Sequence, residues 1–419
     1  MVRGLYTLLF YLLTPFIWLR LIWRARRQPD YLRHLGERYG RYSVRPDGPV
    51  IWVHAVSVGE TRAAQPLIEA LRRQWPTHRI LLTGMTPTGR DAGAQLYGKA
   101  VIQAYLPYDL PFAVDRFFRH FSPSFGVLME TEIWPNLLAS ATRLRVPVML
   151  ANARLSVRSA RGYQRIAALA RPAFACLAGV AAQTEGDAER LRALGAASVT
   201  VCGNLKFDVA PAETMLDLGR QWRVALAGRQ VWLAASTREG EEPLVLEAWS
   251  RAPASGALLV VVPRHPQRFD EVAALLRQRG LRVGRRSEGL PTAEIDVWLG
   301  DSMGEMAAYY ALADFAFIGG SLLPLGGQNL IEAAACGCPV LIGPHTFNFK
   351  QATEDAIAAG AARRVDDAGQ LGQVAARLMD DRAALAAMRA SALAFAAAHR
   401  GATQRMLTVI AAWTGRAGR

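Results

Sequence analysis

The sequence contains few cysteines, and their spacing is not that of a metal site. The four cysteines of the 419-residue chain are Cys176, Cys202, Cys336 and Cys338. The last two form a C-x-C pair, which no second pair and no cluster of histidines accompanies. This pattern excludes a cysteine-based metal framework. It predicts small buried side chains in a reducing compartment.

Lysine is also scarce. The three lysines among the 49 basic residues are Lys99, Lys206 and Lys350. A compact ammonium group and a planar guanidinium group are not interchangeable at a tight site. Each lysine is therefore a candidate for a position that requires an ammonium group.

The remaining composition is that of a positively charged globular protein. With 51% hydrophobic and 20% charged residues, the chain is not of the disordered class. Its length exceeds what one ordinary hydrophobic core holds, so we expect two domains. The net charge of +14 favours an anionic partner, which could be nucleic acid, a phosphorylated substrate or an acidic membrane surface.

Residues 4–23 form the only long apolar run in the sequence. About twenty helical residues extend over about 30 Å, roughly one hydrocarbon core, so we predict a membrane anchor over residues 1–27. Arginines follow within residues 24–27, which places the rest of the chain in the cytoplasm by the positive-inside rule. The absence of a small-residue cleavage site disfavours a signal peptide. A spanning helix and a helix lying in the membrane plane both remain open.

Short apolar segments alternate with Gly-rich turns and amphipathic helices from about residue 50 onward. The first series of expected strands is 50–56, 79–85, 100–107, 125–130, 146–153, 179–184 and 199–204. The second series is 231–237, 257–264, 281–286, 296–300, 315–320 and 339–344. This alternation predicts an α/β protein with open parallel sheets.

The two series are separated at residues 204–215, where Pro211 and polar residues intervene. We therefore predict two doubly wound, Rossmann-like domains, 28–210 and 211–419, that face a cleft. The strongly helical stretch 384–413 could pack back on the N-terminal domain. In such sheets, ligands bind beyond the carboxyl ends of the strands, so functional residues are expected there.

The segment HAVSVGE, which ends at Glu60, follows the first expected strand. Ser57 and Gly59 would let the backbone approach a substrate. Glu60 has two interpretations, which the segment alone does not separate. It is either an acidic residue that favours a helix start or a carboxylate that serves as a catalytic base.

Two further positions of the first domain combine charge with the end of a strand. Glu130 and Glu132 end an expected buried strand, where carboxylates are costly unless they are paired, protonated or functional. Their spacing in an extended segment would place both on one face. Lys206 follows the last strand, where an ammonium group would suit a phosphate or a carboxylate. A structural pair of glutamates and a solvated linker lysine are the alternatives.

The second domain offers groups for an anionic ligand. Arg264 and Arg268, in PRHPQR, could clamp a phosphate or a carboxylate. The Gly-rich loop with Gly326 and Gly327 leads into a helix start at Gln328–Asn329, where free N–H groups and the helix dipole favour an anion. Glu332 follows one turn later and could accept hydrogen bonds from ribose hydroxyls.

The loops lack an Asp-x-Asp cation site and a histidine cluster, so no metal ion or other cofactor is expected. Arginines and helix dipoles would then meet the charge of a leaving group.

Several motifs together resemble one family. They are HAVSVGE, MTPTG, METEIWPN, GNLKFD, ASTREGEE, PRHPQR, DSMGEM and GGQNLIEAAACGCPVLIGPHTFNF. Over nearly the whole chain, the sequence is similar to the bacterial 3-deoxy-D-manno-octulosonic acid (Kdo) transferases specific for lipid A. The resemblance implies the GT-B fold and inverting transfer of Kdo from CMP-Kdo to the lipid A precursor (lipid IVA). It also implies a place on the cytoplasmic side of the bacterial inner membrane, against anionic lipids.

The resemblance also implies roles for residues. It makes Glu60 the base, and it makes Glu130 and Lys206 stabilisers of the transition state. The contacts to CMP would come from Pro263, Arg264, Gly304, Glu305, Met306, Asn329, Leu330, Ile331 and Glu332. Histidine is expected where this chain has Arg238 and Gln328. Both residues can still donate hydrogen bonds, so donor binding should survive, whereas acceptor details or the number of Kdo units could differ.

Two other functions are considered. Another GT-B enzyme that uses a UDP-sugar and a lipid acceptor would need more anion contacts for its diphosphate. A membrane-tethered nucleic-acid-binding protein is disfavoured, because the sequence has no stacking platform, no recognisable recognition helix and no basic run outside the anchor.

Overall fold

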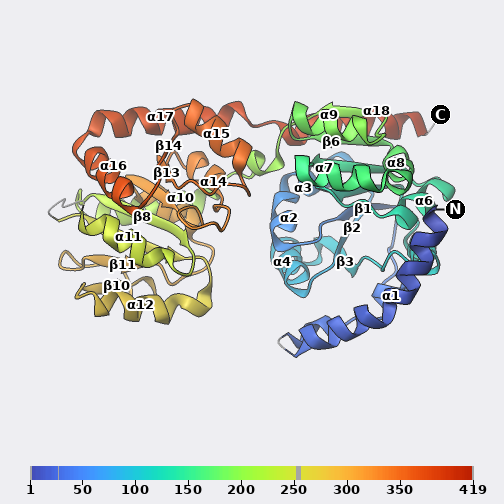
Figure 1. Cartoon of the computed structure of the whole chain (residues 1–419), viewed down its shortest axis with the longest axis horizontal. Coiled ribbons are helices and arrows are strands. Elements are labelled where there is room, and N and C mark those ends of the chain that lie inside the picture. The colour runs from blue at the N-terminus through green and yellow to red at the C-terminus, as the bar shows by residue number, and fades with distance from the viewer. Residues whose placement is uncertain (1, 27, 252–255, 418–419) are drawn as a thin grey trace. The chain divides into compact units, whose positions relative to one another are not determined.

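The computed structural model describes residues 2–26, 28–251 and 256–417, which form two compact units (Figure 1). Unit 1 contains the chain up to Val209 and again from Arg400, and unit 2 contains Ala210–His399. Each unit is built on one parallel sheet of seven strands with helices on both faces.

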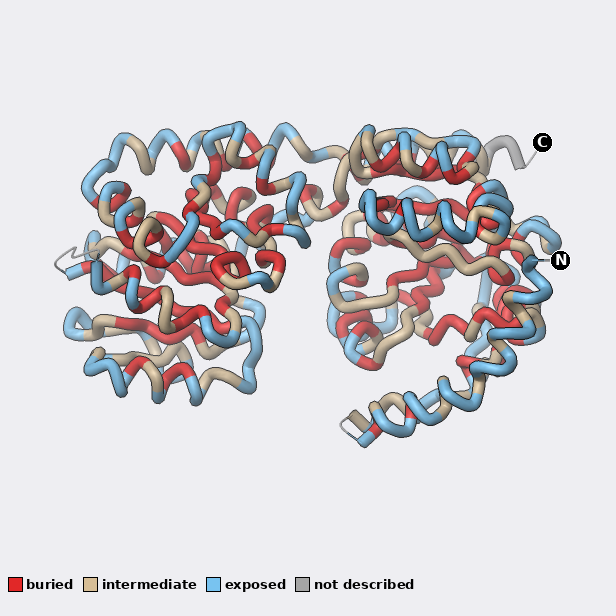
Figure 2. Tube along the Cα trace, in the orientation of Figure 1, coloured by how far each residue is buried: buried red, intermediate tan, exposed pale blue. Residues whose placement is uncertain are grey.

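The sheet of unit 1 has the strand order β3-β2-β1-β4-β5-β6-β7. Its strands are β1 (Val50–His54), β2 (Arg79–Gly84), β3 (Val101–Tyr105), β4 (Phe125–Met129), β5 (Val148–Ala153), β6 (Gly179–Ala182) and β7 (Val199–Val201). Every residue of β1 and β4 is buried (Figure 2), because helices cover both faces of a parallel sheet and the strands are then apolar throughout.

Ten α-helices and four short 3₁₀ helices belong to the described part of unit 1. The α-helices are α1 (Val2–Ala25), α2 (Val58–Ala63), α3 (Gln65–Gln74), α4 (Pro87–Tyr97), α5 (Pro111–Phe121), α6 (Pro135–Arg143), α7 (Val157–Arg165), α8 (Ala167–Ala175), α9 (Glu185–Ala193) and α18 (Ala402–Ala417). The 3₁₀ helices are η1 (Pro29–Leu32), η2 (Glu37–Tyr39), η3 (Gly98–Ala100) and η4 (Leu205–Asp208). Helices α2, α4, α7 and α9 begin at a serine or threonine that accepts a hydrogen bond from the third helical N–H group, which fixes where each helix starts.

The sheet of unit 2 has the order β10-β11-β9-β8-β12-β13-β14. Its strands are β8 (Val231–Thr237), β9 (Leu258–Pro263), β10 (Val283–Arg285), β11 (Val297–Leu299), β12 (Phe315–Ile318), β13 (Val340–Ile342) and β14 (Ala362–Arg364). The α-helices are α10 (Glu213–Ala225), α11 (Glu241–Ser250), α12 (Phe269–Gln278), α13 (Met306–Leu312), α14 (Leu330–Ala335), α15 (Lys350–Ala358), α16 (Ala368–Asp380) and α17 (Arg382–Ala398), and the 3₁₀ helices are η5 (Pro266–Arg268) and η6 (Arg286–Glu288).

The predicted strands all form, and the sequence missed only the edge strand β14. That strand has the sequence ARR, which offers neither an apolar run nor an alternating pattern.

The helical stretch 384–413 is not one helix. It breaks at Gly401, whose φ of +91° favours glycine, and α18 packs Met406, Leu407 and Ile410 into the core of unit 1.

The strand orders locate the switch point of each sheet, which is the place where ligands bind in doubly wound folds. In unit 1 the connections run in opposite directions from β1 and β4, which lie side by side. In unit 2 the corresponding neighbours are β8 and β12. The residues that follow these four strands are therefore the first candidates for each unit's binding site.

Candidate active site

Glu60 lies in the first turn of α2, directly beyond the carboxyl end of β1. Ser57 is the N-cap of this helix, and its Oγ accepts a hydrogen bond from the Glu60 N–H group (3.4 Å). The Ser57 hydroxyl in turn donates to Glu60 Oε1 (2.9 Å), and the Val56 N–H group donates to Glu60 Oε2 (2.9 Å). Glu60 is thus a helix-start residue whose carboxylate is held in one orientation. Gly59 is exposed on the same turn.

The surroundings of Glu60 also change its acidity. The pKa of its carboxyl group is raised to about 7, chiefly by burial. The carboxylates of Glu130 and Glu132 also raise it, whereas the hydrogen bonds from Val56 and Ser57 lower it. A carboxyl group with a pKa near neutral can take up and release a proton at physiological pH. The two interpretations of Glu60 are therefore compatible.

Glu130 follows β4, on the other side of the switch point. Its φ of +57° is left-handed, which is uncommon for a residue other than glycine and often found at functional sites. The Glu130 N–H group donates to the Ala151 carbonyl (2.9 Å), which fixes this turn. The expectation of an extended Glu130–Glu132 segment was wrong, because strand β4 ends at Met129 and the chain turns at Glu130.

Lys206 reaches Glu130 from a distant part of the sequence. The Lys206 Nζ atom lies 3.9 Å from Glu130 Oε1, and both side chains stay partly exposed, at 25% and 33%. Lys206 belongs to η4, and the Asn204 side chain accepts a hydrogen bond from its N–H group (3.0 Å). The ammonium group of Lys206 thus partly offsets the charge of Glu130.

Glu132 is a second carboxylate close to Glu130. Trp134 Nε1 donates to Glu132 Oε2 (2.8 Å), and both side chains are half-buried. Burial raises the pKa of Glu132, and the charge of Glu130 raises it too, whereas the bond from Trp134 lowers it. The three glutamates form one electrostatic cluster in unit 1.

Asn152, which is not among the residues predicted from the sequence, positions the segment that carries Lys206. Asn152 lies on β5, is fully buried and has a left-handed φ of +53°. Its Oδ1 atom accepts a hydrogen bond from the N–H group of Leu205 (3.0 Å), and Leu205 is the residue before Lys206. A buried amide within an otherwise apolar strand was the available signal.

In unit 2, Glu241 organises the loop that follows β12. Its side chain is fully buried and accepts hydrogen bonds from the N–H groups of Gly320, Ser321 (3.0 Å) and Leu322 (3.2 Å), and also from Arg238 (3.0 Å). Glu241 is the first residue of α11. The structure shows that Glu241 joins the segments after β8 and β12 at the switch point.

The expectation that Arg268 clamps a ligand is contradicted. Its two terminal nitrogens contact the two oxygens of Glu242 (2.7 and 3.0 Å), and the side chains are only 12% and 1% exposed. The bidentate geometry that suits a phosphate is used to neutralise a buried carboxylate.

Arg264 is available for a ligand. It is exposed directly after Pro263, the last residue of β9, and its N–H group donates to the Thr237 carbonyl (2.9 Å). Neighbouring His265 has a lowered pKa because of burial and the positive charges of Arg238, Arg264 and Arg268. This local excess of positive charge suits an anion.

The DSMGEM segment places an acidic acceptor at the start of α13. Gly304 has a φ of +85°, and Glu305 is the N-cap residue before Met306. Arg286 donates to Glu305 Oε1 (2.8 Å), whereas the buried Oε2 atom has no hydrogen-bond partner among the described residues. An unsatisfied buried oxygen of this kind can accept a hydrogen bond from a ligand.

Some backbone N–H groups of the Gly-rich loop already donate hydrogen bonds to nearby carbonyl groups. The N–H groups of Gly327 and Gln328 donate to Gly320 (2.7 Å) and Gly319 (2.9 Å), which corrects the expectation that they are free for an anion. Gly326 has a φ of +93°, and an added Cβ atom would lie 2.4 Å from Asn348 Nδ2.

Helix α14 follows this loop. Asn329 caps it by accepting a hydrogen bond from the Ile331 N–H group (3.2 Å). Leu330 and Ile331 are buried, so they could meet a ligand only through their backbone, whereas Glu332 is half-buried.

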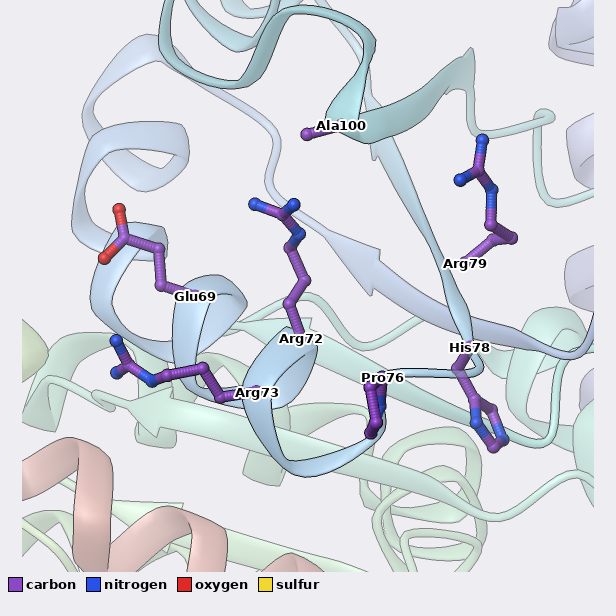
Figure 3. Close-up of a pocket in the computed structure, with 7 residues that line it drawn as sticks. All are labelled: Glu69, Arg72, Arg73, Pro76, His78, Arg79 and Ala100. Carbon is purple, nitrogen blue, oxygen red and sulfur yellow. The ribbon is translucent and has the colours of Figure 1, made fainter.

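A polar cavity of about 500 Å³ lies elsewhere in unit 1 (Figure 3). Its lining residues are Glu69, Arg72, Arg73, Pro76, His78, Arg79 and Ala100. It lies where α3 ends and β2 begins, whereas Glu60 lies beyond the carboxyl end of its strand. This cavity is therefore not the predicted site.

The described residues contain no group of three or more His, Cys, Asp or Glu side chains arranged to hold a metal ion.

Comparisons with known proteins identify similar sequences. The family model described as 3-deoxy-D-manno-octulosonic-acid transferase (kdotransferase) matches residues 33–209, the part that contains Glu60, Glu130 and Lys206. A 3-deoxy-D-manno-octulosonic acid transferase of Bordetella pertussis is 49% identical, covering 99% of this chain and 100% of that protein. The protein of the same description from Haemophilus influenzae is 38% identical, covering 83% of this chain and 84% of that protein.

Solved structures resemble the fold. A glycosyltransferase from Rickettsia africae is 12% identical, with a TM-score of 0.60 and coverage of 87% of this chain and 98% of that one. A UDP-GlcNAc 2-epimerase from Neisseria meningitidis is 16% identical, with a TM-score of 0.60 and coverage of 86% and 99%. Such low identities bear on the fold alone, and they confirm the predicted GT-B class.

The raised pKa of Glu60 predicts a pH-dependent effect of Glu60→Gln on stability. The folded state binds the proton more tightly, with a pKa of about 7 against 4.5, so this stabilising contribution is present below pH 4.5 and lost as the pH rises through 7. Glutamine stays neutral, so the variant should unfold at a higher temperature than the parent at pH 8 and at a similar temperature at pH 4. Thermal unfolding followed by circular dichroism measures this, with Glu69→Gln as a control for the loss of one carboxylate. A difference that does not grow with pH would contradict the prediction.

Proposed function

This chain belongs to the 3-deoxy-D-manno-octulosonic acid (Kdo) transferase family, and we propose that it transfers Kdo from CMP-Kdo to a hydroxyl group of the lipid A precursor lipid IVA. The observation that carries the mechanism is the Glu60 carboxyl group, whose pKa is raised to about 7 at the switch point of unit 1. The reaction takes place on the cytoplasmic side of the bacterial inner membrane.

In this proposal Glu60 is the general base. Its carboxylate accepts the proton of the acceptor hydroxyl while that oxygen attacks the anomeric carbon of Kdo. The bond from this carbon to the phosphate oxygen of CMP breaks, and CMP leaves with the electron pair. A single displacement inverts the anomeric centre. The hydrogen bonds from Val56 and Ser57 hold the carboxylate in position.

Glu130 and Lys206 stabilise the charges of this step. Kdo carries a carboxylate, and the Lys206 ammonium group is the cation within 3.9 Å of Glu130. We propose that the ammonium group meets negative charge on the donor, while Glu130 keeps the lysine in place and stabilises the positive charge that develops on the sugar ring.

The residues of unit 2 bind CMP. Arg264 meets the single phosphate, and the half-buried Arg238 adds positive charge. The unpartnered Oε2 atom of Glu305 and the carboxylate of Glu332 accept hydrogen bonds from the nucleoside. The backbone from Asn329 to Glu332 and the Gly304–Met306 turn complete the contacts. The donor has a single phosphate, and this scheme needs no divalent ion.

Mass spectrometry of the purified chain incubated with CMP-Kdo and lipid IVA tests the function. We expect a product whose mass increases by one or more Kdo units, and CMP should compete with the donor better than UDP, because the site holds groups for one phosphate. A product formed from a UDP-sugar, with none from CMP-Kdo, would contradict the proposal.

Glu60→Gln tests the base. The amide keeps the shape of the side chain and can still bond to Ser57 and Val56, but it cannot accept a proton. We expect the transfer rate to fall by about 10²–10⁴-fold. CMP binding, measured by calorimetry, should stay unchanged, because its contacts lie in unit 2. A transfer rate close to that of the parent would remove Glu60 from this role.

Lys206→Arg tests whether the site needs an ammonium group. The larger planar guanidinium group cannot occupy the same position 3.9 Å from Glu130 Oε1, so we expect a loss of transfer on the order of tenfold or more. Lys99→Arg, on η3, is the matched control and should transfer at the parent rate. Equal transfer rates for the two variants would show that the site needs only a positive charge at position 206 and no ammonium group in particular.

A further inference from the structure

One face of helix α1 contacts other elements of unit 1, namely α6, α8 and the 3₁₀ helix η1 that follows it. The second half of α1 extends beyond the sheet of unit 1 (Figure 1). The buried or half-buried residues of this face are Tyr6, Thr7, Phe10, Thr14, Ile17, Trp18, Leu21, Arg24 and Ala25. Steps of mostly three or four residues place them on one stripe of the helix. This stripe is the face of the helix that meets unit 1, and Leu21 and Ala25 are its buried members.

The docking includes polar contacts with buried groups. The Tyr6 hydroxyl donates to Asp109 Oδ2 (2.9 Å), and the Thr7 hydroxyl donates to Asn136 Oδ1 (3.1 Å). Asp109 is only 2% exposed. Near the other end of the helix, the rings of Trp18 and Tyr39 stack with their centroids 6.0 Å apart.

The opposite face of α1 is apolar and exposed (Figure 2). Its large side chains, each 43–67% exposed, are Leu5, Leu8, Leu9, Leu12, Leu13, Phe16, Leu19, Ile22 and Trp23. An apolar surface of this extent is not stable in water and indicates a partner that is apolar itself.

The edge of this face is cationic. Tyr11 stacks on Phe112 of α5 with the ring centroids 6.3 Å apart, and the guanidinium group of Arg116 lies 5.2 Å from the Phe112 ring centre. Arg20 is exposed on α1 itself. An apolar strip bordered by arginines matches a bilayer with anionic headgroups, because the arginines reach the headgroups while the strip enters the acyl chains.

We propose that α1 lies in the plane of the membrane, inserted through its exposed face into the cytoplasmic leaflet, and does not cross the bilayer. A spanning helix would carry its docked stripe through the hydrocarbon layer, and Asp109 and Asn136 of unit 1 would have to follow it there. The inference rests on the proposed membrane association and is independent of the transfer chemistry.

The docking also relates the membrane to the glutamate cluster. Asp109 accepts hydrogen bonds from the N–H groups of Asn136 (3.0 Å) and Leu137 (2.7 Å) in the first turn of α6. This turn directly follows the segment that carries Glu130 and Glu132. A helix lying in the leaflet would therefore hold that segment beside the membrane surface, where a lipid presents its headgroup.

Labelling of Arg3→Cys in the full chain tests the topology, because Arg3 is exposed and lies on the side of the helix that is not inserted. A membrane-impermeant maleimide should label it in inverted inner-membrane vesicles, as it labels the control Val157→Cys, and should not label it in intact spheroplasts. The parent chain, with its four native cysteines, gives the background. Labelling in spheroplasts, or labelling only after detergent is added, would overturn the in-plane arrangement and leave membrane association intact.

Flotation of the purified chain with phosphatidylethanolamine–phosphatidylglycerol vesicles tests the face itself. The double variant Leu12→Gln/Phe16→Gln should bind vesicles at least about tenfold more weakly than the parent, because two apolar side chains leave the lipid. Val224→Gln, which changes an 81% exposed residue of unit 2, should bind like the parent. If the parent chain forms a dimer or larger assembly and does not bind the vesicles, both the in-plane arrangement and the membrane association are overturned. The transfer activity is then measured separately, in detergent.

Discussion

The candidate site of unit 1 depends on the partial burial of carboxylates that gather at the carboxyl edge of one parallel sheet. Glu60 follows β1, and Glu130 and Glu132 follow β4, its neighbour. Partial burial removes water that would screen their charges, so the pKa values of Glu60 and Glu132 rise. Lys206 contacts Glu130, and Glu60 is left as the group whose proton moves near neutral pH.

The surrounding fold maintains this arrangement. Glu130 and Asn152 both have left-handed backbones, at φ +57° and +53°, directly after or within neighbouring strands. Such conformations persist only where the surrounding structure over-determines them. Asp208, at the end of η4, accepts hydrogen bonds from the N–H groups of Gly401 (2.7 Å) and Thr403 (2.6 Å) at the start of α18. The C-terminal helix is thereby tied to the short helix that carries Lys206.

The sequence allowed the strands and the strand ends to be predicted, because fully buried parallel strands are apolar along their length and the glutamates stand directly after them. The sequence did not show which charged side chain contacts which partner. Arg268 looked like a phosphate ligand, and only the fold shows that its partner is Glu242, 26 residues away. Glu241 likewise has its hydrogen-bond donors in a loop about 80 residues further along the chain. The pKa of Glu60 depends first on burial and also on the carboxylate of Glu130, 70 residues away, and no local sequence pattern reports either.

The central claim is that Glu60 acts as a base with a pKa near neutral. The pH dependence of kcat/KM for Kdo transfer between pH 5 and 9 tests it most directly. We expect kcat/KM to rise tenfold per pH unit at low pH and to level off above about pH 7. The midpoint should be lower in Glu130→Gln, which removes a neighbouring negative charge. A profile that is flat across this range, or a midpoint near 4.5 in the parent, would contradict it.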